Sequence, residues 1–548
     1  MWRLVVLSLL SAGVPFTFGA RGDAPVFHSS YEVQGVLTIP YAELREPFHA
    51  WFDSESGRSR IDYYDGMVKT LQLSSEGKFG VSLKLAPMTT DERLNVPSCF
   101  QVNGTVDEKI TPQTILPDLS DFENAGTELL NGFQCEKWRL ETKNGEKVNK
   151  YVMYIRRKKT AAGLEPIPVR YEMRGYNSLL GSHYDHYYLD YDSYLNQKPQ
   201  ADTFNIHQNA TCTGFPGPGK EHIYSFNPMK EFINNYETHL EHSWAKFITK
   251  HNKKYDHDNN EHHKRKELFR QNLRFIYSHN RKNIGYQLAV NHLADKSDSE
   301  LRVLRGRKYS PGYNGASPFP YLTHVFANSL PEQFDWRLYG AVTPVKDQSV
   351  CGSCWSFGTT GAIEGAYFVK YGKLLRLSQQ ALIDCSWGYG NNGCDGGEDF
   401  RSYQWMLKHG GLPLESDYGG YLGQDGFCHV DKVPLVAKIT GYVNVTTGDE
   451  SALKLAIFKH GPISVAIDAS PKTFSFYSNG VYYDPKCKNT PDGLDHAVLA
   501  VGYGKLNGQS YWLVKNSWSN LWGNDGYILM SAKDNNCGVM TQPTYVTM

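Results

Sequence analysis

The sequence has no excess of charge of one sign and no long apolar run after its first residues. Lysine plus arginine and aspartate plus glutamate both number 57, so the formal net charge is zero. A neutral chain is a poor match for nucleic acid, and we expect no nucleic-acid partner. A membrane-spanning helix needs about 18 consecutive apolar residues. No later segment offers them, so we expect no membrane span.

The chain also lacks the second Cys-x-x-Cys pair that a zinc ribbon requires, because Cys351 and Cys354 form the only one. A thioredoxin-type pair would lie in an early βαβ unit, which the neighbouring sequence does not favour. We therefore predict no metal and no cofactor. Two interpretations of "DQSVCGSCWSFG" remain: two bridged cysteines, or one bridge beside a reactive thiol.

The number of cysteines bears on this choice. Of ten cysteines, seven lie between Cys351 and Cys537. An odd number in one block leaves a thiol over, and a free thiol in an oxidising compartment needs a chemical reason. The three earlier cysteines allow one further bridge, which the sequence does not choose; they are Cys99, Cys135 and Cys212.

The N-terminus, "MWRLVVLSLLSAGVPFTFGA", combines one arginine, a short apolar run and small residues before the expected cut at Ala20. This pattern predicts a signal peptide over residues 1–20. We therefore expect entry to the secretory pathway, with the lysosome, an endosomal granule or the extracellular space as destination. Sequons predict glycosylation at Asn103, Asn209 and Asn444.

Residues 21–230 have the pattern of an antiparallel β domain. In "YEVQGVLTI", apolar and polar residues alternate, and Asn144-Gly145 lies between two strand-like runs, as in a hairpin. A cluster of polar residues within "HYDHYYLDYDSYL" has two interpretations: a metal site or, as we predict, the polar edge of a tyrosine-rich strand. It comprises His183, Asp185, His186, Asp190 and Asp192.

The period changes to helical between about 235 and 285. Six residues recur every three or four positions and so lie on one stripe of a helix: Glu261, Arg265, Phe269, Asn272, Ile276 and Asn280. Periodicity alone indicates an amphipathic helix and nothing more specific.

Two downstream stretches settle the cysteine question. "GLDHAVLAVGYG" contains His496 and "YWLVKNSWSNLWGNDGY" contains Asn516 and Trp518. Together with "DQSVCGSCWSFG", "NNGCDGG" and "GPISVAIDA", they resemble the papain-like cysteine proteases over residues 329–548. The resemblance implies an α+β class, with one helical lobe and one β-barrel-like lobe.

The resemblance also implies a role for each matching residue. Cys354 would be the nucleophile and His496 its general base, forming a thiolate–imidazolium pair. Asn516 would orient the imidazole, and Trp518 would shield that hydrogen bond from water. Gln348 and the Cys354 N–H would stabilise the oxyanion.

Structural and substrate-contacting residues follow from the same resemblance. Three bridges are implied: Cys351–Cys394, Cys385–Cys428 and Cys487–Cys537. Two acids and an amide make the implied S2 pocket polar. We expect it still to accept aromatic or aliphatic side chains and to tolerate basic ones better than usual. The residues implied in substrate binding are Gly352, Gly396, Gly397, Glu398, Asp399, Ala466, Leu494, Ala497, Trp518 and Gln542.

The helical stripe resembles the interspersed motif of cathepsin L-type propeptides, so residues 231–328 are expected to be an inhibitory propeptide. A histidine group among lysines suggests an acid trigger for its release, although a solvated basic face is equally compatible. The group comprises His251, His257, His262 and His263. The whole layout is similar to the insect haemocyte two-chain cysteine proteases, which implies a β domain retained as a non-covalent partner.

We therefore expect a secreted or lysosomal cysteine endopeptidase made as a zymogen, with protein or peptide substrates and its own propeptide as inhibitor. The alternative is a secreted binding or adhesion protein whose protease domain is silent. The expected division of the chain is 1–20, 21–230, 231–328 and 329–548.

Overall fold

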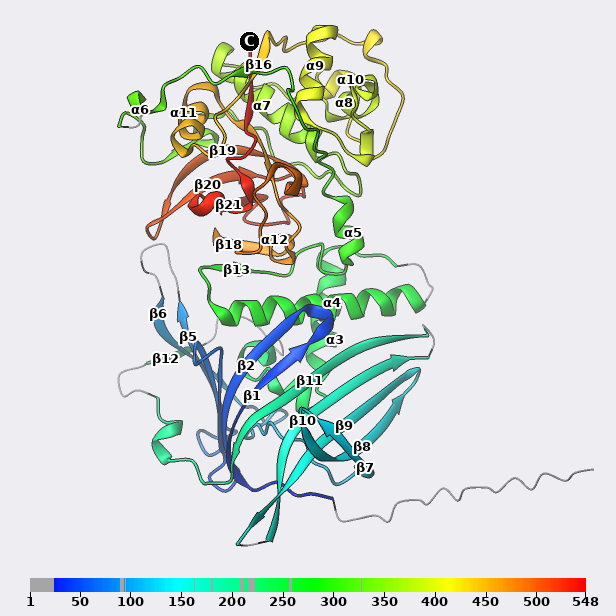
Figure 1. Cartoon of the computed structure of the whole chain (residues 1–548), viewed down its shortest axis with the longest axis vertical. Coiled ribbons are helices and arrows are strands. Elements are labelled where there is room, and N and C mark those ends of the chain that lie inside the picture. The colour runs from blue at the N-terminus through cyan, green and yellow to red at the C-terminus, as the bar shows by residue number, and fades with distance from the viewer. Residues whose placement is uncertain are drawn as a thin grey trace, which may run out of the picture.

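The computed structural model describes residues 24–88, 93, 95–161, 163–178, 181–206, 211–214, 222–255, 259–326 and 328–548. The expected signal peptide, the Asn209 sequon and His257 lie outside these ranges. Figure 1 shows three parts stacked along the long axis. We call them the N-terminal domain (24–214), the middle segment (222–326) and the C-terminal domain (328–548). Within the described residues, no helix is both long and apolar enough to cross a membrane.

The N-terminal domain is one open, bent sheet of twelve strands, in the order β12-β6-β5-β4-β3-β2-β1-β11-β10-β9-β8-β7. Every pairing is antiparallel except that of β12 with β6. The strands are β1 (Ser30–Ile39), β2 (Leu44–Asp53), β3 (Arg58–Tyr63), β4 (Val68–Leu73), β5 (Val81–Met88), β6 (Val96–Asn103), β7 (Glu123–Leu130), β8 (Phe133–Asn144), β9 (Lys147–Thr160), β10 (Gly163–Asn177), β11 (Ser182–Leu195) and β12 (Cys212–Gly214).

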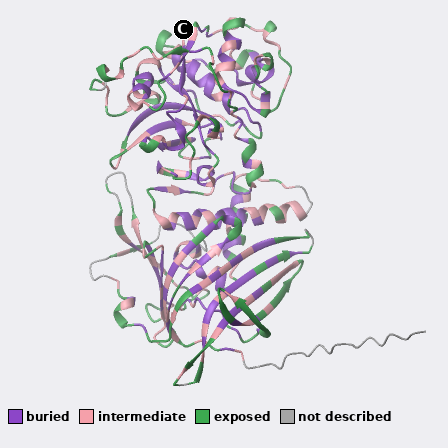
Figure 2. Cartoon of the chain, viewed as in Figure 1, coloured by how far each residue is buried: buried purple, intermediate pink, exposed green. Residues whose placement is uncertain are grey.

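The sequence pattern predicts this sheet well. Along β1, Tyr31, Val33, Leu37 and Ile39 are buried while their neighbours are more exposed, because successive side chains of a strand point to opposite faces. Figure 2 shows the same alternation along several strands. The expected hairpin joins β8 to β9, and Gly145 adopts the positive φ that its tight turn requires.

The middle segment contributes α1 (His222–Phe226), α2 (Met229–Asn234), α3 (Thr238–Lys250), α4 (Asn259–Lys282), β13 (Tyr286–Leu288), α5 (Asp298–Val303), β14 (Ser317–Pro318) and α6 (Thr323–Phe326). The long helix α4 lies between the two larger domains (Figure 1). Its predicted stripe is confirmed: Phe269 and Ile276 are buried, and Asn272 donates to the Ala294 carbonyl at 2.8 Å.

The opposite face of α4 binds the N-terminal sheet through buried ion pairs. Arg274 donates two hydrogen bonds to Asp185 of β11, at 2.7 and 3.1 Å. Arg270 lies 3.6 Å from the same carboxylate, and Arg281 donates to Glu46 of β2 at 2.7 Å. Within this cluster the pKa of Asp185 stays low, although its burial alone would raise it. Helix α4 is therefore clamped between two domains.

The predicted polar edge of β11 needs correction at one position. Asp185 is fully buried against α4 rather than exposed at an edge. Two of its neighbours do lie in partly exposed strand pairs: His186 contacts Glu172 at 2.8 Å, and Asp190 accepts from Arg170 at 2.6 Å. The sequence could not distinguish these roles, because the partner helix is more than eighty residues away.

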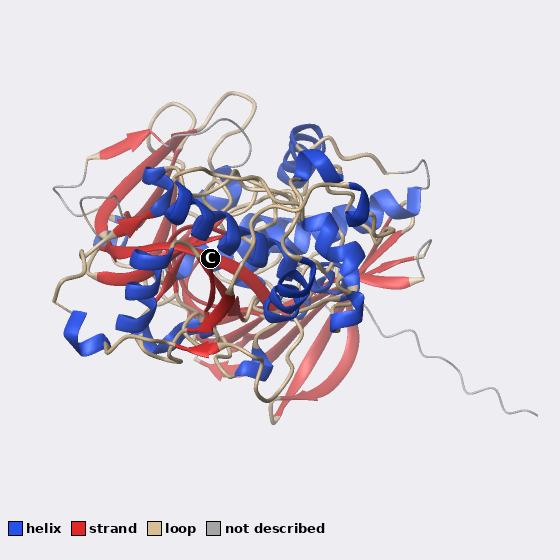
Figure 3. Cartoon of the chain, turned by 90° about the horizontal axis from the view of Figure 1, so that it is seen from above, coloured by secondary structure: helices blue, strands red, loops and turns tan. Residues whose placement is uncertain are grey.

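The C-terminal domain has two lobes, and seen from above in Figure 3 both helices and strands contribute to it. The helices are α7 (Cys354–Tyr371), α8 (Gln379–Cys385), α9 (Asp399–His409), α10 (Glu415–Tyr418), α11 (Glu450–His460) and α12 (Lys472–Ser475). The strands are β15 (Phe334–Asp335), β16 (Gly441–Asn444), β17 (Ile463–Ile467), β18 (Tyr477–Tyr482), β19 (His496–Leu506), β20 (Gln509–Lys515), β21 (Tyr527–Ser531) and β22 (Thr544–Thr547).

The strands of this domain form an open sheet, β13-β18-β21-β20-β19-β17-β22-β16-β14, with β15 beside β19. The expected β-barrel-like lobe is therefore not a closed barrel. The middle segment supplies both end strands of this path. It also shares one hydrophobic core with the C-terminal domain, in which Trp244, Phe269 and Tyr286 pack with Phe474 and Trp518.

Four disulfide bridges are present. Three join the cysteines that the resemblance pairs: Cys351–Cys394, Cys385–Cys428 and Cys487–Cys537. The fourth joins Cys99 to Cys212, which lie opposite each other on β6 and β12. Cys135 and Cys354 stay outside any bridge, and both are buried.

Candidate active site

Cys354 is the first residue of α7, which ends in a left-handed cap at Gly372. The Cys354 sulfur accepts a hydrogen bond from the backbone N–H of Ala497 at 3.5 Å. Ala497 follows His496, the first residue of β19, so folding brings the thiol and the imidazole together from distant parts of the chain. The sulfur is free to react because Cys351, not Cys354, forms the neighbouring bridge.

A hydrogen bond at Nε2 fixes the orientation of the His496 imidazole. Its Nε2 lies 2.8 Å from Oδ1 of Asn516. The same oxygen accepts from the Ser517 N–H at 2.8 Å, so Asn516 must present its oxygen and His496 its N–H. Trp518 covers the imidazole, with ring centroids 4.9 Å apart. Nδ1 makes no hydrogen bond to the described chain and so keeps its lone pair.

Gln348 is fully buried beside this pair. Its Oε1 accepts from the Ser517 hydroxyl at 2.6 Å, which fixes the direction of the amide. Its Nε2 donates to the carbonyl oxygens of Cys351 at 2.7 Å and Leu304 at 2.9 Å. Leu304 belongs to the middle segment, so a carbonyl of that segment occupies the donor expected to serve an oxyanion.

Burial opposes ionisation of both reacting groups in this closed state. It raises the pKa of the Cys354 thiol to about 11 and lowers that of His496 to about 4. Desolvation disfavours the charged form of either group. In this closed state burial therefore favours the neutral thiol and the neutral imidazole over the ion pair that the resemblance implies.

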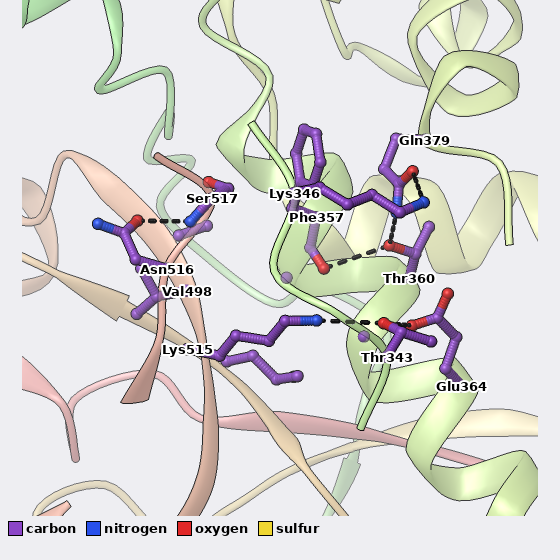
Figure 4. Close-up of a pocket in the computed structure, with 14 residues that line it drawn as sticks. Thr343, Lys346, Phe357, Thr360, Glu364, Gln379, Val498, Lys515, Asn516 and Ser517 are labelled. Carbon is purple, nitrogen blue, oxygen red and sulfur yellow. Dashed lines mark hydrogen bonds between the residues drawn. The ribbon is translucent and has the colours of Figure 1, made fainter. Parts of the chain in front are cut away.

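A small cavity lies behind the site, between α7 and the β19–β20 ladder. Figure 4 shows Lys515 reaching toward Thr343, with Glu364 beyond it. The Thr343 hydroxyl donates to Glu364 at 2.8 Å, and burial raises the pKa of that carboxyl. Burial also lowers the pKa of Lys515 to about 8. This network ties the two lobes together next to Asn516.

The middle segment runs through the cleft in extended conformation. Gly397 donates to the Gly306 carbonyl and accepts from the Lys308 N–H, both at 2.9 Å. The contact at Arg307 is a parallel bridge. Gly352 lies so close that a Cβ on Gly306 would meet the Gly352 carbonyl oxygen at 1.8 Å. Gly396 lies against the same strand, which therefore blocks the approach of any substrate.

The residues expected to form S2 divide into two groups. A cavity of about 230 Å³ is lined by Glu398, Asp399, Ala466, Ala497 and Gln542. Leu494 is not in its lining but turns its carbonyl oxygen to the same occupant, the Arg307 side chain, at 2.7 Å.

Two of the sequons lie in the described chain. Asn103 is exposed at the end of β6. Asn444 is half-buried and exchanges hydrogen bonds of 3.0 and 3.1 Å with Asn314 of the middle segment. A glycan on Asn444 would require that pairing to open.

Sequence reasoning missed the residues that occupy the site in this closed state. Leu304, Arg307 and Ser310 contact it, and nothing in their local pattern identifies them. Ser517, which positions both Gln348 and Asn516, was missed too, although its place in "NSWSN" was a usable signal.

A buried cysteine outside any bridge, set against a histidine that an asparagine orients, defines a thiol hydrolase. The papain family cysteine protease model matches residues 330–547, and the cathepsin propeptide inhibitor domain model matches residues 244–301. The residues before 244 lie outside both matches.

Similar proteins support the same family assignment. Digestive cysteine proteinase 1 of Homarus americanus is 45% identical over 313 residues, covering 56% of this chain and 94% of the relative. The cathepsin L-like peptidase of Aedes aegypti is 44% identical over 336 residues, covering 59% and 97%. The solved digestive procathepsin L2 proteinase from Tenebrio molitor larval midgut is 34% identical, covers 56% of this chain and 100% of that one, and has a TM-score of 0.52.

This chain belongs to the papain family of cysteine proteases. It is the zymogen of a cysteine endopeptidase. The β-sheet N-terminal domain precedes the propeptide in the same chain.

Proposed function

We propose that Cys354 is the nucleophile, His496 its general base and later acid, Asn516 the orienting residue, and Gln348 an oxyanion donor. The supporting observation is the position of the unbridged Cys354 sulfur against the Ala497 N–H, one residue after the oriented imidazole. We also propose the domain boundaries 21–230, 231–328 and 329–548.

The geometry supports the following reaction in a cleared cleft. Nδ1 of His496 accepts the thiol proton, and the thiolate forms a bond to the scissile carbonyl carbon. The carbonyl oxygen gains the electron pair and is stabilised by Gln348 Nε2 and the Cys354 N–H. Collapse expels the amine, which takes the proton from His496. Water, deprotonated by His496, then hydrolyses the thioester and restores the thiol.

Labelling with an epoxide that alkylates activated thiols tests this assignment. After acid treatment of the full-length chain, mass mapping should find the label on Cys354 and not on Cys135, the other buried cysteine outside a bridge. Burial raises the pKa of Cys135, and no histidine of the described residues is among the groups that oppose this shift. An unlabelled Cys354 in acid-treated protein would contradict the enzyme and favour a binding protein.

We further propose that the N-terminal domain and α4 stay attached after the chain is cut, while the later part of the middle segment, from Leu304 through β14, leaves the cleft. The support is the position of α4, which binds the N-terminal sheet by ion pairs on one face and shares the C-terminal core on the other. Both domains therefore hold the same helix. The domain would travel through the secretory pathway, where its Cys99–Cys212 bridge forms in oxidising conditions.

The acid trigger is better placed on a different histidine from those expected. Burial lowers the pKa of His251 and of His262, so the folded chain opposes the charging of both histidines. His279 of α4 is more deeply enclosed, and burial lowers its pKa to about 4. Its Nε2 has no hydrogen-bond partner within the described chain.

His279 should make docking of the middle segment pH-dependent. Its folded pKa lies below the ordinary value of about 6.5, so the unfolded state binds more protons between pH 6.5 and 4 and stability falls as pH falls through that window. The loss is at most about 3 kcal/mol. In urea unfolding, His279→Phe should flatten this dependence, whereas exposed His324→Phe should not. Equal slopes in both variants would contradict the trigger.

A further inference from the structure

The cavity that the family resemblance identifies as S2 holds an arginine of the middle segment. We propose that this enzyme selects substrates with a basic residue, arginine above lysine, at P2, the position two residues before the scissile bond. The proposal rests on the proposed function of Cys354 and adds the substrate class that the same site accepts.

The guanidinium of Arg307 is bound by acceptors of the C-terminal domain. Nη1 donates to the carbonyl oxygens of Pro491 at 2.8 Å and Leu494 at 2.7 Å, and Nη2 donates to Oε1 of Gln542. Burial lowers the pKa of Arg307, while Asp399 and Glu398 oppose that shift by attraction. Three acceptors arranged around a planar donor group suit arginine better than the point charge of lysine.

The backbone around Arg307 has the register that a substrate would use. Its two neighbours, Gly306 and Lys308, both hydrogen-bond to Gly397, so Arg307 is the residue directly opposite that glycine. An extended substrate paired with Gly397 presents one side chain to the same cavity, whichever direction its chain runs. The cavity therefore contacts the side chain of the substrate residue that faces Gly397 and can select substrates by it.

Departure of the later part of the middle segment from the cleft increases the acidity available in this pocket. Glu398 now accepts from the Ser310 N–H at 3.0 Å and from its hydroxyl at 2.5 Å, as well as from Arg401 at 2.9 Å. Ser310 leaves with the propeptide, and only Arg401 remains. The freed oxygens of Glu398, which is otherwise buried, then face the pocket without those two donors.

An apolar P2 residue satisfies this pocket poorly. The apolar part of the lining can pack against the methylene stem of an arginine; it comprises Phe400, Val445, Val465, Ala466, Ala497 and Pro543. Leucine or phenylalanine would cover Gln542 Oε1 and the carbonyl oxygens of Pro491 and Leu494 without donating to them, and unpaired buried acceptors are costly. The pocket discriminates by hydrogen bonding more than by size.

The test uses the full-length chain activated by acid and fluorogenic dipeptides with arginine fixed at P1. Arginine at P2 should exceed its uncharged isostere citrulline by about tenfold in kcat/KM, and should at least equal leucine. A tenfold preference for leucine over arginine, or equal rates for arginine and citrulline, would overturn the proposal. Failure to hydrolyse any of the dipeptides would instead contradict the proposed function.

Two variants at one position sharpen the result. Gln542→Leu should lower the arginine-to-leucine ratio by about tenfold, because it removes the acceptor facing Nη2. Gln542→Glu should raise the ratio, because a carboxylate binds guanidinium more strongly than an amide does. A ratio that neither variant changes would overturn the role of Gln542, and the citrulline comparison in the unmodified enzyme holds if a variant misfolds.

Discussion

Cys354→Ala should abolish turnover and leave the acidified zymogen at full length. Without the sulfur no thioester can form, and the remaining groups can only polarise the carbonyl. Activity against a dipeptide substrate and the mobility of the chain after acid treatment measure the two effects. Full activity in this variant would remove the basis of the mechanism.

The chain offers a matched control and a graded comparison. Cys135→Ala also removes a buried thiol outside any bridge, but in the N-terminal domain, and should keep its activity. Gln348→Ala should lower kcat by about 10²–10³, the usual effect of losing one oxyanion donor. A Gln348→Ala enzyme as active as the unmodified one would show that its Nε2 serves only to bind the propeptide carbonyl.

Arg274→Met should destabilise the zymogen by about 3 kcal/mol. The substitution leaves Asp185 buried with one remaining cation, Arg270, at 3.6 Å, and breaking one partner of a buried ion pair costs more than the pair itself contributes. Urea unfolding at neutral pH measures the loss. We also expect the N-terminal domain to separate more readily from the activated enzyme.

Two controls separate a specific ion pair from a general loss of charge. Exposed Arg302→Met removes one positive charge on α5 and should change stability by less than about 0.5 kcal/mol. The double variant Arg274→Met with Asp185→Leu should recover part of the lost stability, because it removes the stranded charge. If Arg274→Met lowers stability no more than Arg302→Met does, the ion pair with Asp185 does not hold α4 on the sheet.

The sequence predicts most of the catalytic geometry because short motifs specify it. The pairing of Cys351 with Cys394 and the contact of His496 with Asn516 were implied by the resemblance that these short stretches carry, and both are present. The alternating strands of the N-terminal domain are predictable for a different reason, since burial of one face imposes a period of two.

The contacts between domains could not be predicted in the same way. Asp185 has the local pattern of an exposed strand residue, and only the approach of α4 buries it. Arg307 lies in a linker without periodicity, and its role depends on a pocket built from residues near Pro491 and Gln542. Ionisation is equally non-local, because the pKa of Cys354 is raised by burial among residues that are distant in the sequence.

Strands β13 and β14 are the two edge strands of the C-terminal sheet. Loss of β14 exposes the edge of β16, and an exposed strand edge of this kind can pair with another extended peptide. Retention of α4 with β13 keeps the β18 edge covered, including the Phe476 carbonyl oxygen, which accepts from the Ala289 N–H. The activated enzyme thus has one docking edge, at β16, that the precursor does not have.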